Sequence, residues 1–168
     1  MFRDMRRKNQ QMSEKEAIKV LSNSSYGVLG LIGDGGYPYT VPLNYIFCDG
    51  KVYFHCASEG HKIDSVKNDD RASFCVVEKD DVVPSMLATD FCSVILFGRV
   101  GFVSGDDEKR RVLLQFVEKF APEFSEYGHA EIEKLLDRVC ILEFCIEHIS
   151  GKTALKSVQE ANRKTGTI

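Results

Sequence analysis

The spacing of apolar residues changes from a helical to a strand-like pattern early in the chain. Ser13 and Glu16 form a capping-box pattern, and the apolar residues that follow recur at every third or fourth position, which predicts a short helix over residues 13–22. Beyond it, apolar segments are separated by turns that contain Asp-Gly, as in an antiparallel meander. The predicted strands of this meander cover residues 26–33, 37–47 and 51–57.

The second predicted strand is interrupted by Pro38 and Pro42. Proline has no backbone N–H and cannot donate a hydrogen bond within a sheet, so we expect this strand to lie at an edge, to be bulged, or to be open on one side. An open strand of this kind leaves room for a ligand against its backbone.

The rest of the chain continues as strands with a few helices. Gly98 and Gly101 are expected to bend a long apolar strand, and long bent strands close barrels. The pattern predicts a mainly β fold, a small antiparallel β-barrel of about six strands with peripheral helices, rather than a parallel doubly wound sheet. The expected elements are helical turns over 62–70, a central strand over 71–79, a loop or lid over 79–90, a bent strand over 91–104, a helix starting at Asp106, a short helix over 129–136 and a closing strand over 138–152.

The composition is that of an ordinary soluble globular domain. Of the 168 residues, 43% are hydrophobic and 28% are charged, and no apolar run approaches the roughly 18 residues of a membrane helix. The net charge of -3 argues against a nucleic-acid binder, and the charged start without an apolar stretch behind it predicts a cytoplasmic protein. We expect one domain over 1–168, with a solvated basic arm at 1–12 and a flexible tail at 157–168.

The 6 cysteines are expected to stay reduced, because a chain of this length without an export signal needs no disulfide scaffold. Cys75, Cys140 and Cys145 lie in apolar segments and are interpreted as core residues. A metal site is not expected: the sequence has no CxxC pair, and the adjacent His55 and Cys56 would point to opposite faces of a strand.

The segment YFHCASEGHK, residues 53–62, joins the end of a strand to the start of a helix. The segment places three groups beside the N–H groups at the helix start: the hydroxyl of Ser58, the permissive backbone of Gly60 and the positive charge of Lys62. Such a set of groups suits a phosphate. A capped surface turn would have the same composition, so both interpretations remain open. A lone histidine such as His55 is more often a hydrogen-bonded structural residue than a catalyst.

Several segments in order resemble the nitroimidazole-resistance (Nim) proteins of the pyridoxamine 5'-phosphate oxidase-like superfamily of flavin-binding split barrels. These segments are MRRKNQ, YGVLGLIGDGGYPYTVPLNYIF, VYFHCASEGHK, SFCVVEKDDVVP, SVILFGRV and the late ISGK, which together span residues 5–152. The resemblance implies a six-stranded antiparallel split β-barrel of the FMN-binding type. It also implies a homodimer with FMN, or FAD as the alternative, between the subunits.

The resemblance further implies which residues form the site. One strand would face the flavin ring with its backbone, the end of the next would line the phosphate side, and Ser93 and Val94 would come from the partner subunit. His55 is the implied catalytic residue, since a histidine can deliver a proton during nitro-group reduction. Lys152 matches the family's late Gly-Lys, although a surface lysine would look the same. The implied cofactor-binding residues are Val41, Pro42, Leu43, Asn44, Phe54, His55, Cys56, Ser58, Gly60, His61, Lys62, Ser93, Val94 and Lys152.

The implied function is flavin-dependent reduction of small nitro-aromatic compounds such as 5-nitroimidazoles, and hence resistance to those antibiotics. One alternative is a flavin- or haem-binding split barrel without turnover. Another is an enzyme like pyridoxamine-phosphate oxidase, although the sequence lacks that enzyme's arginine-rich signature for the substrate phosphate. Neither a nucleic acid nor a membrane is an expected partner.

Overall fold

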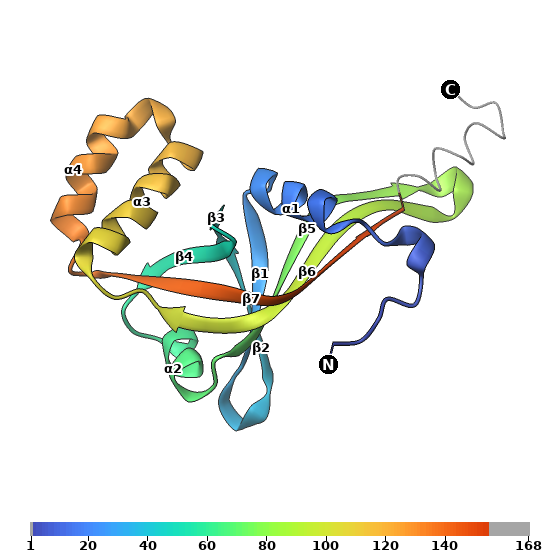
Figure 1. Cartoon of the computed structure of the whole chain (residues 1–168), viewed down its shortest axis with the longest axis horizontal. Coiled ribbons are helices and arrows are strands. Elements are labelled where there is room, and N and C mark those ends of the chain that lie inside the picture. Colours follow the sequence, from blue (N-terminus) through green and yellow to red (C-terminus); the bar gives the residue numbers. More distant parts are fainter. Residues whose placement is uncertain (1, 155–168) are drawn as a thin grey trace.

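The computed structural model describes residues 2–154, so the tail predicted at 157–168 lies outside the described residues. The described chain forms a mainly β structure with antiparallel strand pairs and peripheral helices, as predicted (Figure 1). No helix within residues 2–154 is long and apolar enough to cross a membrane.

The strands are β1 (Tyr26–Ile32), β2 (Pro38–Asn44), β3 (Ile46–Cys48), β4 (Lys51–Ala57), β5 (Arg71–Val83), β6 (Ala88–Phe102) and β7 (Val139–Thr153). The helices are α1 (Glu14–Asn23), α2 (His61–Asn68), α3 (Asp106–Phe120) and α4 (Ser125–Leu135).

The sheet closes on itself at Tyr45. The strand order is β2-β1-β5-β6-β7-β4-β3, so the two edge strands are consecutive in sequence and only Tyr45 separates them. The chain therefore runs from one edge of the sheet to the other and curls the sheet into a barrel. The Tyr45 side chain is fully buried, and its hydroxyl donates a hydrogen bond to the carbonyl oxygen of Leu21 at 2.7 Å. Residues 2–154 hold 7 strands rather than the expected six, because Tyr45 divides the strand predicted at 37–47.

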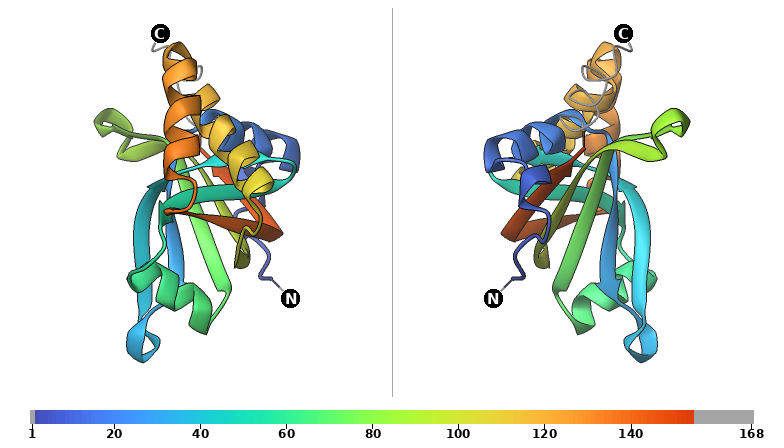
Figure 2. Two further views of the ribbon diagram at one scale, coloured as in Figure 1. Left: turned by 90° about the vertical axis from the view of Figure 1, so that its left-hand side faces the viewer. Right: turned by 90° about the vertical axis from the view of Figure 1, so that its right-hand side faces the viewer.

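The main core lies inside the barrel, and α1 and α2 contribute to it from opposite ends (Figures 1 and 2). The predicted capping box of α1 is confirmed: the Glu16 N–H donates to Ser13 Oγ at 3.3 Å, and the Ser13 N–H donates to Glu16 Oε2 at 2.8 Å. The edge position of β2 is also confirmed, because β2 pairs with β1 alone. The prolines of β2 therefore remove no hydrogen bond from the sheet interior.

The loop or lid predicted over 79–90 is wrong. These residues extend β5 and β6 into a two-stranded ribbon, which continues in register from Lys79 opposite Cys92 to Val83 opposite Ala88 and turns through Pro84–Met86. The ribbon projects from the barrel near α1 (Figure 1). A projecting ribbon exposes both faces to water, so its polar residues do not follow the one-sided alternation expected of a strand on a core.

Helices α3 and α4 form a hairpin at one end of the barrel (Figure 1). The helix predicted over 129–136 starts too late, since α4 begins at Ser125 and passes through Gly128. A Cβ at Gly128 would lie 2.7 Å from Val117 Cγ1 of α3. Glycine at this position therefore allows the two helices to approach closely, instead of ending the helix.

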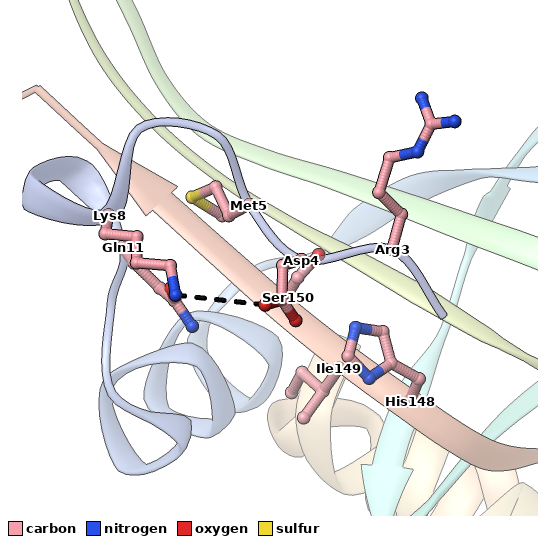
Figure 3. Close-up of a pocket in the computed structure, with 8 residues that line it drawn as sticks. All are labelled: Arg3, Asp4, Met5, Lys8, Gln11, His148, Ile149 and Ser150. Atoms are coloured by element: carbon pink, nitrogen blue, oxygen red, sulfur yellow. Dashed lines mark ion pairs between the residues drawn. The ribbon is translucent and has the colours of Figure 1, made fainter. Parts of the chain in front are cut away.

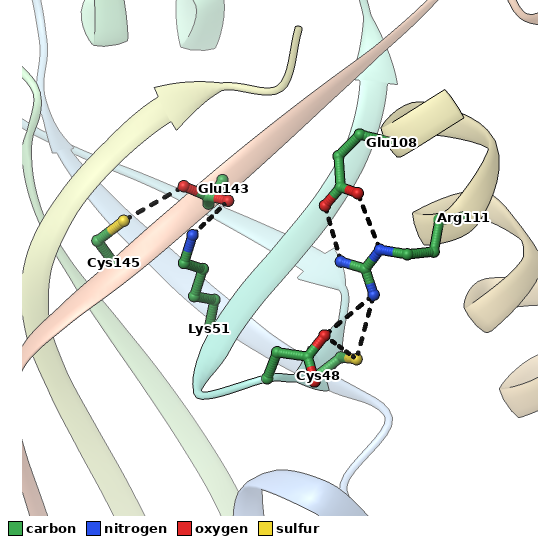
Figure 4. Close-up of polar contacts among 7 residues, drawn as sticks. Cys48, Lys51, Glu108, Arg111, Glu143 and Cys145 are labelled. Atoms are coloured by element: carbon green, nitrogen blue, oxygen red, sulfur yellow. Dashed lines mark hydrogen bonds and ion pairs between the residues drawn. The ribbon is translucent and has the colours of Figure 1, made fainter. Parts of the chain in front are cut away.

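Arg111 attaches this hairpin to the turn between β3 and β4 (Figure 4). Its guanidinium donates to Glu108 Oε1 at 2.7 Å within α3 and to Asp49 Oδ2 at 3.1 Å in the turn. Beside this cluster, Lys51 Nζ donates to Glu143 Oε2 at 3.0 Å across β4 and β7. Ion pairs that are this exposed contribute about 1 kcal/mol or less each. Among them, the pair between Arg111 and Asp49 connects α3 to the β3–β4 turn.

The register between β6 and β7 shifts at Gly98, one of the two glycines at which a bend is predicted, and the extra residue there is Glu147 of β7. The core position expected for Cys145 is wrong: Phe144 points into the barrel, and Cys145 lies exposed on the opposite face. Cys75 and Cys140 are half-buried.

The N-terminal arm is not freely solvated as expected. The Phe2 ring stacks on His148 of β7 at 4.8 Å, and the Met12 N–H donates to the carbonyl oxygen of Gly151 at 2.9 Å. The arm therefore follows β7, while the side chains of Arg3, Arg6, Arg7 and Lys8 stay exposed.

Candidate functional site

The turn between β4 and α2 presents an uncapped helix N-terminus. Gly60 precedes α2 with φ 111° and ψ 171°, and no side chain accepts a hydrogen bond from the first turn of the helix. Residues 57–61 are all exposed, including Ser58. The first N–H groups of a helix have no partner inside the helix and carry partial positive charge. The turn is therefore suited to an anion, and the binding of a phosphate by Ser58 and Gly60 stays a prediction.

His61 attaches α2 to the hairpin between β1 and β2. Its ring stacks on Tyr39 with 4.1 Å between centroids, and its Nε2 lies 3.8 Å from Asp34 Oδ2. Tyr39 and Asp34 are neighbours that the sequence analysis did not identify, because they belong to a different part of the chain. His61 thus has a positioning contact in addition to its predicted place beside a ligand.

Lys62 is the half-buried cation of the turn, and its charge reaches His55 at the end of β4. Burial, and after it the charge of Lys62, hold the pKa of His55 below its ordinary value of 6.5. At pH 7 the His55 imidazole is therefore neutral, although part of the ring is exposed to solvent.

The His55 ring lies against the α3–α4 hairpin. It meets Phe116 edge to face, with 4.7 Å between ring centroids and an interplanar angle of 86°. His55 also lines a pocket of about 240 Å³ whose other walls are mainly apolar. The other lining residues are Leu113, Val117, Gly128, Glu131, Ile132, Leu135 and Val139.

On β2, the predicted residues divide between the two faces of the strand. Val41 and Leu43 are half-buried and pack against the core, whereas Pro42 and Asn44 are exposed. The Asn44 side chain donates from Nδ2 to the carbonyl oxygen of Ser25 at 3.0 Å, so it is held against the start of β1. The backbone along the free edge of β2 is the part of this strand that a ligand can approach.

Ser93 and Lys152 lie together, but far from the turn at the end of β4. They are direct partners in the β6–β7 ladder, and Lys152 Nζ lies 5.0 Å from the centre of the Phe91 ring. On β7, Lys152 is 12 residues from Cys140, the register partner of Cys56. At about 3.3 Å per residue this separation approaches 40 Å, so one subunit does not bring the two groups of predicted residues together.

Three predicted residues have little or no exposed side chain. Phe54 and Val94 are fully buried in the main core, so only their backbones are open to a ligand. Cys56 is half-buried and faces Cys140 across the ladder. Within residues 2–154, no group of three or more His, Cys, Asp or Glu side chains is arranged to hold a metal ion.

A second pocket lies beneath the N-terminal arm (Figure 3). It has a volume of about 290 Å³ and is lined by Arg3, Asp4, Met5, Lys8, Gln11, His148, Ile149 and Ser150. The Lys8 ammonium lies 3.8 Å from Asp4 Oδ2, and both side chains are largely exposed. No local sequence pattern indicates this pocket, because its walls form only when the arm folds back along β7.

Comparison with known proteins gives one family match and several structural relatives. The sequence profile described as pyridoxamine 5'-phosphate oxidase matches residues 13–153. None of the curated proteins matches the sequence.

The structural relatives share this fold at low sequence identity. A candidate 5-nitroimidazole antibiotic resistance protein from Bacteroides thetaiotaomicron is 18% identical, with a TM-score of 0.70 over 84% of this chain and 85% of that chain. A conserved hypothetical protein from Mycobacterium tuberculosis is 18% identical, with a TM-score of 0.78 over 89% of this chain and 90% of that chain. An FAD-binding protein from Mesorhizobium loti is 24% identical, with a TM-score of 0.63 over 84% of this chain and 95% of that chain. At these identities the likenesses establish the fold, and the predicted barrel class is confirmed.

Proposed function

The chain belongs to the pyridoxamine 5'-phosphate oxidase family, and on this premise we propose that it is a flavin-binding oxidoreductase. FMN is the expected cofactor and FAD is the alternative. The relative from Mesorhizobium loti, named as an FAD-binding protein, supports a flavin in general.

The observation that carries the proposal is the uncapped N-terminus of α2. Gly60 turns the chain so that the first amides of α2 meet solvent without a side-chain partner, and Lys62 adds a half-buried positive charge. Amides and a lysine arranged in this way would hold the phosphate of the flavin, since charge-assisted hydrogen bonds are the stronger ones. Ser58 would add a hydroxyl donor, and the free edge of β2 would lie against the ring system.

His55 is the group of this site that can move a proton. Its imidazole is neutral at pH 7 and lies beside an apolar pocket, so it can hold a substrate by hydrogen bonding or deliver a proton after it has been protonated. A bound flavin would supply electrons to a substrate in this pocket. Phe116 restricts the orientation of the His55 ring.

We infer that the substrates are small nitro-aromatic compounds. The pocket beside His55 has a mainly apolar lining, which favours an apolar ring over a charged substrate. The relative from Bacteroides thetaiotaomicron, named as a candidate 5-nitroimidazole antibiotic resistance protein, supports the same substrate class.

We propose further that the site is completed by a second subunit. Ser93 and Lys152 lie too far from Lys62 to reach the same cofactor within one chain, given the length of β7 between them. A homodimer in which one barrel end meets the opposite end of the other barrel would bring them together. The exposed apolar side chains of Val77, Ile95 and Phe97 on β5 and β6 offer a surface for such a contact.

Turnover is tested by anaerobic reduction of a 5-nitroimidazole, with the protein loaded with FMN and a chemical or nicotinamide electron donor. We expect the nitro absorbance to be lost in proportion to enzyme, and His55→Gln to slow the loss while flavin stays bound. A protein that holds flavin but reduces no nitro compound with any donor would favour a binding protein over a reductase.

The shared site is tested by mixing two inactive variants. Lys62→Ala and Lys152→Ala are expected to bind flavin weakly on their own. After the mixture is unfolded and refolded together, about half the dimers are mixed, and each mixed dimer holds one site without either substitution. Recovery of about one quarter of the wild-type flavin sites supports a site that takes Lys62 from one subunit and Lys152 from the other. No recovery would mean that both lysines of a site come from one chain, or that one of them does not belong to the site.

A further inference from the structure

Two of the cysteines lie directly opposite each other on adjacent strands of the barrel. Cys56 on β4 and Cys140 on β7 are register partners in an antiparallel pair. Side chains of such partners lie on the same face of the sheet, with Cα atoms about 4.5 to 5.5 Å apart. A disulfide needs a Cα separation of about 4.4 to 6.8 Å, so the backbone already holds these thiols at bonding range.

Among the strands of residues 2–154, Cys56 and Cys140 are the one pair of cysteines that are register partners. The register partners of the other four cysteines in strands of residues 2–154 are all of other residue types. Cys48 faces Lys51, Cys75 faces Val28 and Ile95, Cys92 faces Lys79 and Thr153, and Cys145 faces Lys51 and Arg99.

The surroundings of the pair favour the protonated form of the Cys140 thiol. Both thiols are half-buried and pack against the main core, close to the turn that leads to Lys62. Burial, followed by the negative charge of Cys56 and a hydrogen bond with it, raises the pKa of Cys140 to about 11, while Lys109 and Lys62 act in the opposite direction. The Cys140 thiol is therefore protonated at pH 7.

We propose that Cys56 and Cys140 form a reversible cross-strand disulfide when the protein meets a low-molecular-weight disulfide such as oxidised glutathione. The Cys56 thiolate attacks one glutathione sulfur, and the other glutathione leaves as a thiolate and takes up a proton. The Cys140 thiolate then attacks the Cys56 sulfur of the mixed disulfide and releases the second glutathione. In sum, two protein thiols are oxidised by two electrons, and one glutathione disulfide is reduced to two glutathione thiols.

The new bond would join the end of β4 to the start of β7, next to the proposed phosphate turn. It would close a loop of about 80 residues, which restricts the unfolded chain strongly. We expect the oxidised protein to melt about 5 to 15 °C above the reduced protein. This effect does not depend on flavin, so it can be measured whether or not the proposed function holds.

The test uses the purified full chain, treated with excess oxidised glutathione and then blocked with a thiol alkylating reagent. We expect the number of free thiols to fall from 6 to about four and to return after dithiothreitol. Trypsin alone leaves Cys140 and Cys145 in one peptide, residues 139–152, so cleavage after Glu143 by a Glu-specific protease must follow. The linked product should join Cys56 to the peptide of residues 139–143.

Variants separate this pair from general thiol oxidation. Cys56→Ser and Cys140→Ser should each abolish the linked product and the rise in melting temperature. Cys75→Ser is the matched control, because Cys75 is also half-buried in a strand but has no cysteine partner, and this variant should behave as the wild type. The proposal is overturned if the wild type keeps all its thiols, carries glutathione without an internal link, or joins a different pair.

Discussion

The replacement Gly60→Ala tests whether the turn before α2 is built on a backbone conformation that only glycine adopts easily. At φ 111° and ψ 171°, Gly60 lies in a region that is strained for residues with a Cβ. No heavy atom lies within 4 Å of the position that the new Cβ would occupy, so steric collision with neighbours adds nothing. The expected cost is the backbone strain alone, about 1 to 3 kcal/mol of the free energy of unfolding.

The assay is urea denaturation followed by far-ultraviolet circular dichroism, together with flavin titration. The matched control is Gly101→Ala, since Gly101 also has no neighbour within 4 Å of a Cβ but its φ is not positive. Gly101→Ala is expected to leave stability unchanged or to raise it by up to about 1 kcal/mol, because alanine restricts the unfolded chain. For Gly60→Ala we expect the free energy of unfolding to fall by about 1 to 3 kcal/mol and the flavin affinity to fall with it.

If Gly60→Ala were as stable as Gly101→Ala, the strained geometry of the turn would be incorrect. If stability fell but flavin affinity stayed at the wild-type level, the amides of α2 would not be the phosphate site. The two readouts therefore test the structure of the turn and its proposed role separately.

Three further predictions address Lys62, His55 and Gly98. Lys62→Ala should weaken flavin binding by about 10- to 100-fold, because a charge-assisted contact is lost. The control is Lys67→Ala, since Lys67 is exposed at the other end of α2, and this variant should change the affinity less than twofold in the same titration. Because the pKa of His55 lies below its ordinary value, the proton-donating form predominates only below that lowered pKa, and nitro reduction should slow as the pH rises through it. A rate profile unchanged by His55→Gln would rule out the role, with His148→Gln as the control. Gly98→Ala should lower the free energy of unfolding by about 2 kcal/mol or more in urea denaturation, since the new Cβ would collide with the carbonyl oxygen of Cys145. If the free energy of unfolding fell no more than in Gly101→Ala, the close approach of β6 and β7 would be contradicted.

Features with a local cause were predictable from the sequence. The capping box at Ser13 and Glu16 uses residues three positions apart, so its pattern is complete in a short segment. The edge position of β2 follows from the missing N–H groups of its prolines, whatever the rest of the fold.

Features that depend on neighbours distant in sequence were not predictable in this way. The contact between His55 and Phe116 joins β4 to a helix 60 residues later, and no local pattern specifies it. Gly128 has the local signature of a helix end, yet the packing of Val117 against it keeps α4 continuous. The polar residues after Lys79 indicate a loop, but pairing with β6 makes them a ribbon.

The distance between Lys62 and Lys152 has the largest consequence for the proposed site. The resemblance placed both residues at one cofactor, and only the three-dimensional path of β7 shows that one chain separates them. The sequence alone therefore does not specify how the predicted site residues are arranged in space.

The most direct test of the central claim is the absorption spectrum of the purified protein, followed by mass analysis of any chromophore released on denaturation. We predict a yellow protein with the two absorption bands of an oxidised flavin, and release of FMN or, as the alternative, FAD. Protein purified without cofactor should quench the fluorescence of added FMN at a stoichiometry of about one per chain, and Lys62→Ala should weaken this binding. A colourless protein that takes up neither flavin would contradict the account.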